Sequence, residues 1–310
     1  MDSVPLVFSE RVAAFWKCCD NPYCEGRHIQ RRIPDCGSTW TRISRKRRIE
    51  FYVVMENGKW VYGFVDPEQT SGAKRFLAMD ELKNSPGLKN VVIREIFVYD
   101  KWLNPAMAAK LRPLDADKEV LMKFVLFLTN EPFLRVHSLR HTFPETFASP
   151  EGSMLFNWLQ EMHFSHVYFD HYNANYNRLL ERQYSRRKPP RIEISSIESG
   201  GEFLEAELAA LRLQKCFISN YLSPYVVDAI VERFLENPSQ FGEDYKVTCY
   251  FTIEGTAKIL REMRQKTRFV REYANKKTGN EEFAVEGANG KVLNISSHFG
   301  LMWTLSGQTS

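Results

Sequence analysis

Residues 191–219 read RIEISSIESGGEFLEAELAALRLQKCFIS, and they contain the change of pattern that decides the fold. Residues 191–197 alternate apolar and polar side chains, as a half-buried β-strand does. Ser199-Gly200-Gly201 predicts a turn, and apolar side chains at helical spacing follow in residues 203–214. Phe217-Ile218-Ser219 predicts a second short strand. The stretch therefore predicts a strand, a turn, a helix and a further strand.

The same unit recurs along the second half of the chain. Strands are expected to start near residues 133, 166, 191 and 217, at spacings of 33, 25 and 26 residues. The expected helices span residues 117–128, 150–163, 174–182, 203–214 and 224–235. This rhythm fits a short leucine-rich-repeat-like solenoid, and an open α/β sheet with crossover helices explains it equally. The predicted fold class is α/β, with alternating strand–helix units of leucine-rich-repeat-like character.

The ends of the chain follow other patterns. An amphipathic helix is expected at residues 4–16, and a β-hairpin at residues 49–65, turning at Asn57-Gly58. Another strand is expected at residues 90–99. The C-terminal region predicts strands at residues 246–253, 268–273 and 292–296 and a helix at 255–263. The predicted domains are a helical segment at residues 1–48, a small β-rich region at 49–112 and an α/β region at 113–310.

Composition bounds the possible partners and the compartment. The formal net charge is +4, and the first 50 residues alone hold ten Lys/Arg against six Asp/Glu. The rest of the chain is therefore balanced, which argues against a generally basic nucleic-acid-binding surface. The N-terminus lacks the pattern of a signal peptide, and no apolar run is long enough to span a bilayer. We expect a cytoplasmic or nuclear protein with reduced cysteines and no membrane partner.

Neither a metal site nor a catalytic site is predicted. Cys18, Cys19, Cys24, His28 and Cys36 lie close together in the sequence, but they lack the paired Cys-x₂-Cys turns of zinc sites. Five histidines between residues 137 and 171 include no zinc-binding His-Glu-x-x-His motif. No nucleophile elbow, Walker A loop or dinucleotide-binding glycine motif is present either. We therefore expect a protein that is not an enzyme and has no cofactor.

Two basic runs provide the alternative function. The first contains Arg42, Arg45, Lys46, Arg47 and Arg48, and the second contains Arg186, Arg187 and Lys188. Such runs neutralise phosphates in nucleic-acid-binding proteins, although they are more often solvated loops. A nucleic-acid-associated protein is thus the second hypothesis from the sequence.

Two stretches carry a family resemblance. Residues 4–12, VPLVFSERV, with residues 36–43, CGSTWTRI, resemble the two ends of an F-box. Between residues 130 and 191, NEPF, SPEGS, NWL, LERQ and KPPR are similar to the pattern of nematode F-box-associated proteins. The second resemblance covers roughly residues 117–197.

The resemblance implies a non-catalytic role in recognition. The N-terminal segment would dock on the Skp-type adaptor of a cullin-based ubiquitin ligase, and the α/β region would present a surface to an unknown target protein. The implied adaptor-binding residues are Val4, Pro5, Leu6, Phe8, Val12, Phe15, Trp16 and Trp40. Alternatively, the apolar side chains of residues 4–16 cover the core of the hairpin region, because an amphipathic helix must bury its apolar face somewhere.

Overall fold

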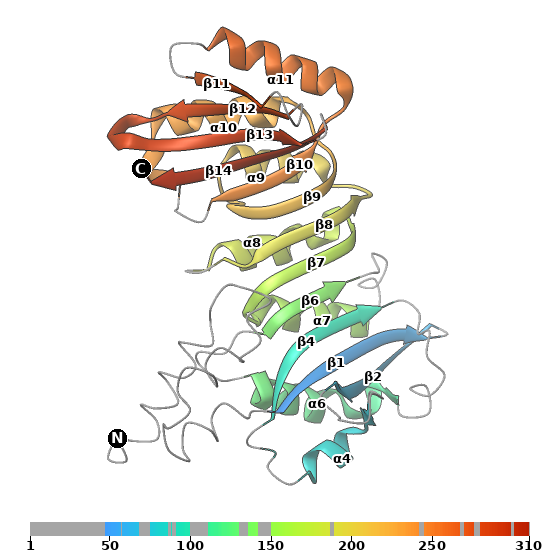
Figure 1. The fold of residues 1–310 in the computed structure, drawn as a ribbon. Helices are drawn as coiled ribbons and strands as arrows, with labels where there is room; N and C mark the ends of the chain where they lie inside the picture. The colour runs from blue at the N-terminus through green and yellow to red at the C-terminus, as the bar shows by residue number, and fades with distance from the viewer. Residues whose placement is uncertain are drawn as a thin grey trace, which may run out of the picture. The chain divides into compact units, whose positions relative to one another are not determined.

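The computed structural model describes residues 47–56, 58–67, 75–85, 88, 91–99, 111–129, 136–141, 150–186, 189–241, 245–266, 270–275, 280–298 and 301–309 (Figure 1). The chain forms two compact units. The described residues from 47 to 140 belong to the first unit and those from 166 to 309 to the second, with residues 150–165 divided between them. Strands and helices alternate along both, so the predicted α/β fold class is confirmed.

The first unit begins with the predicted β-hairpin. Strands β1 (Arg47–Glu56) and β2 (Lys59–Asp66) pair antiparallel, with Phe51 opposite Phe64. Gly58 has φ +74°, a left-handed conformation that glycine adopts without steric cost. Asn57 lies outside the described residues. The turn chemistry and the alternation of apolar residues therefore specify the same register.

The remaining elements of the first unit extend this sheet. Strand β4 (Val91–Tyr99) runs parallel to β1, and β3 (Arg75–Leu77) and β5 (Arg112–Pro113) both pair with β2. Strand β6 (Val136–His141) lies next to β4 in the sheet order. A short helix, α4 (Met79–Lys83), follows β3.

Helix α6 (Leu114–Thr129) covers one face of this sheet. Its side chains at Leu121, Phe124, Val125 and Leu128 recur every three or four residues and are buried. The ring of Phe124 meets that of Phe64 edge-on, at 5.9 Å between centroids. Because α6 packs on β2 and β4, it belongs to the first unit, whereas the sequence analysis grouped it with the region from residue 113 onward.

The second unit contains the predicted strands near residues 166, 191 and 217, whereas the one predicted near residue 133 corresponds to β6 of the first unit. Strands β7 (Phe164–Tyr172), β8 (Arg191–Ile197), β9 (Lys215–Tyr221) and β10 (Lys246–Tyr250) are consecutive parallel neighbours. The connections contain α8 (Asn177–Tyr184), α9 (Gly201–Ala209) and α10 (Tyr225–Glu236), and α11 (Ile253–Gln265) follows β10. Helix α7 (Pro150–Glu161) precedes β7. Short 3₁₀ turns lie at Ala174–Tyr176, Pro238–Gln240 and Ala288–Gly290.

An antiparallel meander ends the second unit. It consists of β11 (Val270–Asn275), β12 (Asn280–Glu286), β13 (Lys291–His298) and β14 (Met302–Thr309), and β14 pairs with β10. The local sequence pattern predicts neither β12 nor β14. The same pattern extends the strand of β10 to residue 253. That strand ends at Tyr250, since Thr252 caps α11 by accepting a hydrogen bond from the Gly255 amide at 3.0 Å.

Burial divides the second unit's sheet into two faces. Val167, Ile192, Cys216 and Val247 are aligned in register on neighbouring strands, and all four are buried. Their face meets helices, as shown by the Trp303 indole on β14, which lies 3.4 Å from the Thr256 hydroxyl on α11. Helices α8, α9 and α10 lie behind the strands in Figure 1. The alternate residues of each strand therefore point to the opposite face, which none of the described helices covers.

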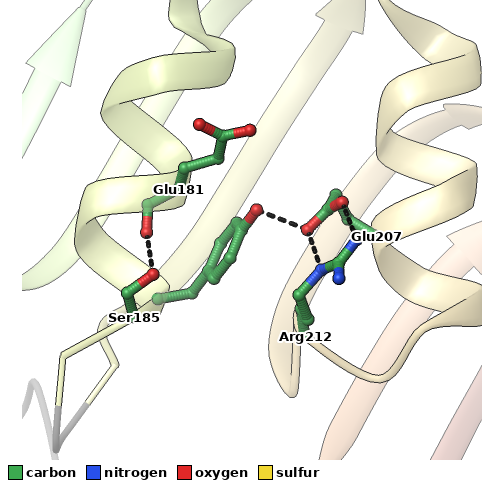
Figure 2. Close-up of polar contacts among 5 residues, drawn as sticks. Glu181, Ser185, Glu207 and Arg212 are labelled. Atoms are coloured by element: carbon green, nitrogen blue, oxygen red, sulfur yellow. Dashed lines mark hydrogen bonds and ion pairs between the residues drawn. The ribbon is translucent and has the colours of Figure 1, made fainter.

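A polar contact joins α8 to α9 (Figure 2). After α9 the chain turns at Leu211, which has φ +59°, and the Arg212 amide donates to the Glu207 carbonyl at 3.0 Å. This turn directs the Arg212 guanidinium back to the Glu207 carboxylate, with Nε to Oε2 at 2.6 Å and Nη2 to Oε1 at 2.5 Å. The Tyr184 hydroxyl, at the end of α8, donates to the same carboxylate. Glu207 is thus buried but hydrogen-bonded on both oxygens.

We predict that Glu207→Gln lowers the free energy of unfolding at pH 7 by about 2 kcal/mol, because a buried charged hydrogen bond is lost. Burial alone would raise the pKa of Glu207, but the hydrogen bonds from Arg212 and Tyr184 and the Arg212 charge lower it overall. The carboxylate therefore stabilises the fold above its unfolded pKa, and this stabilisation is lost as the pH falls. Urea unfolding from pH 7 to about pH 3 should show the two proteins converging.

The control for this prediction is Glu181→Gln on α8, an exposed carboxylate whose side chain makes no contact in Figure 2. It should change the unfolding free energy by less than about 0.5 kcal/mol at either pH. An equal loss in both variants would contradict the role given to Glu207.

The two glycines before α9 provide a matched pair of substitutions. Gly200 has φ +80°, and a Cβ there would lie 3.1 Å from the Ala174 Cα, whereas a Cβ at Gly201 would meet only Ile197 at 3.7 Å. We predict that Gly200→Ala destabilises the protein by about 1–3 kcal/mol, because both the conformation and the close approach oppose a side chain. Gly201→Ala should be neutral or slightly stabilising. Thermal unfolding of the two variants tests the difference.

Candidate interaction surface

The face that no described helix covers presents a continuous set of polar and aromatic residues. Adjacent strands place these side chains in register along one row, from β7 through β8, β9, β10, β14 and β13 to β12. The row consists of Tyr168, Glu193, Phe217, Thr248, Thr304, Ser296 and Glu282. Most of them are half-buried, as expected on an open sheet face. We call this face the open sheet face.

Contacts between neighbouring strands hold these side chains in place. The hydroxyls of Tyr168 and Ser195 lie 2.8 Å apart, and those of Thr248 and Thr304 lie 3.1 Å apart. The rings of Phe217 and Tyr250 meet edge to face at 6.3 Å between centroids. The surface is therefore ordered by cross-strand pairs, which lowers the entropy cost of binding a partner.

A second row lies at the start of the parallel strands. In each of the four strands, the residue just before the first in-register buried residue is basic or an imidazole, and it lies on the open sheet face. These residues are His166, Arg191, Lys215 and Lys246. The Arg191 guanidinium lies 2.7 Å from the Glu193 carboxylate, and the His166 ring lies 3.4 Å from it. This row is not among the sites predicted from the sequence. The sequence signal for the row is a four-residue pattern: a basic residue, a buried residue, a variable residue and a second buried residue. RIEI and KCFI are examples.

The adaptor-binding residues from the family resemblance lie outside the described residues. This applies to Val4, Pro5, Leu6, Phe8, Val12, Phe15, Trp16 and Trp40. The cysteine cluster and the basic residues Arg42, Arg45, Lys46, Arg187 and Lys188 also lie outside. Their roles remain those inferred from the sequence.

Two described members of the basic runs, Arg47 and Arg186, make contacts within the fold. The Arg47 guanidinium binds the nearly buried Asp66 carboxylate, with Nη2 to Oδ2 at 2.6 Å. Arg186 Nη2 donates to the Gln160 carbonyl at 2.9 Å, and burial lowers the pKa of Arg186. Both side chains therefore connect neighbouring elements. These contacts make the two arginines less available to bind a phosphate backbone.

A serine, a histidine and a carboxylate come together at the end of β7 and β8. His171 Nδ1 lies 2.9 Å from the Ser196 hydroxyl and 3.4 Å from the Glu198 carboxylate. A catalytic triad places its serine and its acid on opposite ring nitrogens, but here both approach the same nitrogen. In the part of the chain that the structure describes, no three His, Cys, Asp or Glu residues form a group that could hold a metal ion.

Two comparisons with known proteins found no match. No protein-family model matches this chain, and a search of curated proteins also found none. Among the described residues, no helix combines the length and the apolar character that crossing a membrane requires.

The two described cysteines give the prediction for this part of the molecule. Cys216 and Cys249 are buried on the helix-covered face, and burial raises the pKa of Cys216 to about 12 and that of Cys249 above its ordinary value. Because the thiolate is the reactive form, iodoacetamide at about pH 8 should leave both unmodified in the folded protein and label both in urea. Peptide mass spectrometry distinguishes them from other cysteines. Fast labelling of either cysteine in native buffer would contradict the conclusion that both thiols are buried and unreactive.

Proposed function

We propose that this chain is a non-catalytic recognition protein whose open sheet face binds another protein. One observation carries the proposal: helices cover one face of β7–β10, while the other presents in-register side chains from Tyr168 to Thr304. Leucine-rich-repeat-like proteins bind their partners on extended strand surfaces of this kind. The hydroxyls and half-exposed rings provide hydrogen bonds and apolar contact area together.

The family resemblance supports a specific setting for this recognition. The N-terminal segment, with Phe8 and Trp16 among its apolar residues, docks on a Skp-type adaptor, and the second unit presents the bound target to a cullin-based ubiquitin ligase. Such a subunit positions a substrate and needs no catalytic residue of its own. It works in the cytoplasm or the nucleus.

Quantitative affinity purification of the full-length chain from cells tests both halves of the proposal. Wild type should capture a Skp-type adaptor and a set of target proteins. Phe8→Asp should lose the adaptor and keep the targets, because a charge replaces an apolar anchor. Ser219→Trp combined with Thr304→Trp should keep the adaptor and lose the targets at least fivefold, since bulky neutral rings obstruct the open sheet face.

The matched control carries the same rings on the helix side, as Glu236→Trp with Arg261→Trp on exposed positions of α10 and α11. It should capture everything that wild type captures. If wild type captures no adaptor, the proposed role in a ubiquitin ligase is wrong. If the variant with tryptophans on the open sheet face captures the same targets as wild type, that face is not the binding surface.

A further inference from the structure

Three exposed apolar side chains gather at the carboxyl edge of the parallel strands. Tyr221 ends β9, Tyr225 begins α10 and Ile253 begins α11, and their exposed fractions are 57%, 59% and 74%. No other large apolar side chain among the described residues of the second unit is exposed. Single exposed apolar residues are normal on a protein surface, whereas a group of them marks an interaction site. We call these three residues the apolar edge patch.

Backbone contacts bring the three residues to one place. Tyr221 lies opposite Tyr250 in the register of β9 and β10, and the ring of Tyr250 packs against Phe217 on the open sheet face. The Leu222 amide donates to the Tyr250 carbonyl at 2.9 Å, which holds the end of β9 beside the end of β10. The patch therefore adjoins the open sheet face.

The start of α11 lies against the connection between β9 and α10. A Cβ placed on Gly255 would lie 3.8 Å from Pro224 Cδ. Tyr225 follows Pro224 directly, and Ile253 precedes Gly255 by two positions. The first turns of α10 and α11 thus present their exposed apolar residues at the same edge of the sheet.

Carboxylates from two helices border the patch. The Glu205 carboxylate on α9 accepts a hydrogen bond from the Ser223 amide at 2.6 Å, and Ser223 lies between the two tyrosines in the chain. Glu202 lies one helical turn before Glu205 on α9, and Glu254 directly follows Ile253 on α11. Apolar and negatively charged side chains are therefore neighbours at this edge.

Two of these carboxylates have no cation beside them. Glu202 and Glu254 are exposed, and neither forms an ion pair with another described residue. Lys258, one turn after Glu254 on α11, pairs instead with Glu262 at 3.7 Å. The segments that end the strands and begin the helices contain neither lysine nor arginine, and these segments are residues 195–206, 219–228 and 250–257.

The remaining positive charges near the patch leave its negative balance in place. Lys266 binds Asp228 on α10 and lies 3.5 Å from Glu232, so two carboxylates share this one ammonium. A helix N-terminus carries about half a positive elementary charge, which offsets only part of each carboxylate in a first turn. The edge is therefore an apolar surface with a negative border.

We propose that the apolar edge patch binds a basic segment of the target protein. An apolar side chain of that segment contacts the patch, and its arginines or lysines face Glu202, Glu205 and Glu254. Charge complementarity carries the inference. Arginine suits this surface because its guanidinium pairs with carboxylates and stacks on tyrosine rings. The inference rests on the proposed function and gives the chemistry of one part of the bound target.

The same charges disfavour the other partners that an exposed apolar patch could bind. The carboxylates would repel a phosphate backbone and the anionic surface of a membrane. A second copy of this chain would bring the same patch from both sides in a two-fold contact, and its carboxylates would then oppose each other. A segment that combines basic and apolar residues matches both features of the edge.

Fluorescence anisotropy of the full-length protein with defined probes tests this partner class. The main probe is a short peptide in which arginines alternate with leucines between glycine–serine ends. The comparison probes are the same peptide with glutamine for arginine, the same peptide with serine for leucine, and a short thymidine oligonucleotide. We expect the main probe to bind at least tenfold more tightly than each of the others. Raising the ionic strength from about 0.05 to 0.2 M should weaken its binding severalfold.

Paired substitutions in the patch locate the apolar contact. Tyr225→Ser with Ile253→Ser should weaken the main probe about tenfold, because both exposed side chains lose their apolar area. The matched control, Leu126→Ser with Phe127→Ser, removes exposed apolar side chains from α6 of the first unit. It should bind the probe as wild type does. Circular dichroism of each variant establishes that it is folded.

A second pair of variants tests the charges. Glu202→Gln with Glu254→Gln should weaken the main probe about tenfold and reduce the salt dependence of its binding. The control, Glu181→Gln with Glu236→Gln, removes two exposed carboxylates near the far ends of α8 and α10. It should change neither the affinity nor the salt dependence.

Several results would overturn the inference. They are equal weakening by a control pair, no preference for the main probe over the glutamine or serine peptide, or tighter binding of the oligonucleotide. Sedimentation velocity tests the remaining occupant, and we expect wild type to be a monomer. A dimer that Tyr225→Ser with Ile253→Ser abolishes would make the patch a contact between two copies and would also contradict the proposal.

Failure of this inference is separable from failure of the proposed function. The two are compared by capturing target proteins with the patch variants and with the variant that carries tryptophans on the open sheet face. If only the tryptophan variant loses the targets, the open sheet face still binds protein and the assignment of a basic segment to the patch is wrong.

Discussion

The parallel pairing of β7, β8, β9 and β10 in a common register is the constraint on which the second unit depends. It aligns Val167, Ile192, Cys216 and Val247 beneath the helices. Since side chains alternate along a strand, the same alignment sets the positions of the residues on the other face. A shift of one residue in any strand would exchange its apolar and polar sides. Each apolar side chain exposed in this way would lose about 1.5–3 kcal/mol of stabilisation from burial. Core and surface are therefore determined together.

Local pattern predicted much of this architecture. Residues 191–197 form a strand with the predicted bounds, and the hairpin at residues 49–65 and the strand at 91–99 also lie where the pattern indicates. These segments alternate strongly and end at turn residues. Strands β12 and β14 read NEEFAVE and MWTLSGQT, whose polar residues obscure the alternation, and their stability comes from partners far along the chain. Pairing partners of that kind leave little trace in a local window.

The candidate site was less accessible from sequence for a related reason. The basic runs are clusters along the sequence, yet Arg47 binds Asp66 and Arg186 binds a backbone carbonyl. The row of His166, Arg191, Lys215 and Lys246 contributes one residue per strand, separated by more than twenty positions of sequence each time. Only the register brings Arg191, Lys215 and Lys246 together. A functional surface that takes one residue from each parallel strand is dispersed in the sequence, because a long connection separates consecutive strands.

The antiparallel contact between β14 and β10 has a consequence for how this molecule can vary. A parallel strand–helix array is open-ended, because its last strand presents unpaired backbone groups that another unit can extend. Here Val247 and Cys249 pair with Leu305 and Trp303, so the returning C-terminal strand occupies that edge. New units cannot be appended there without displacing the meander. The recognition surface can gain length from within the array and diversity from its side chains, while its C-terminal border stays fixed.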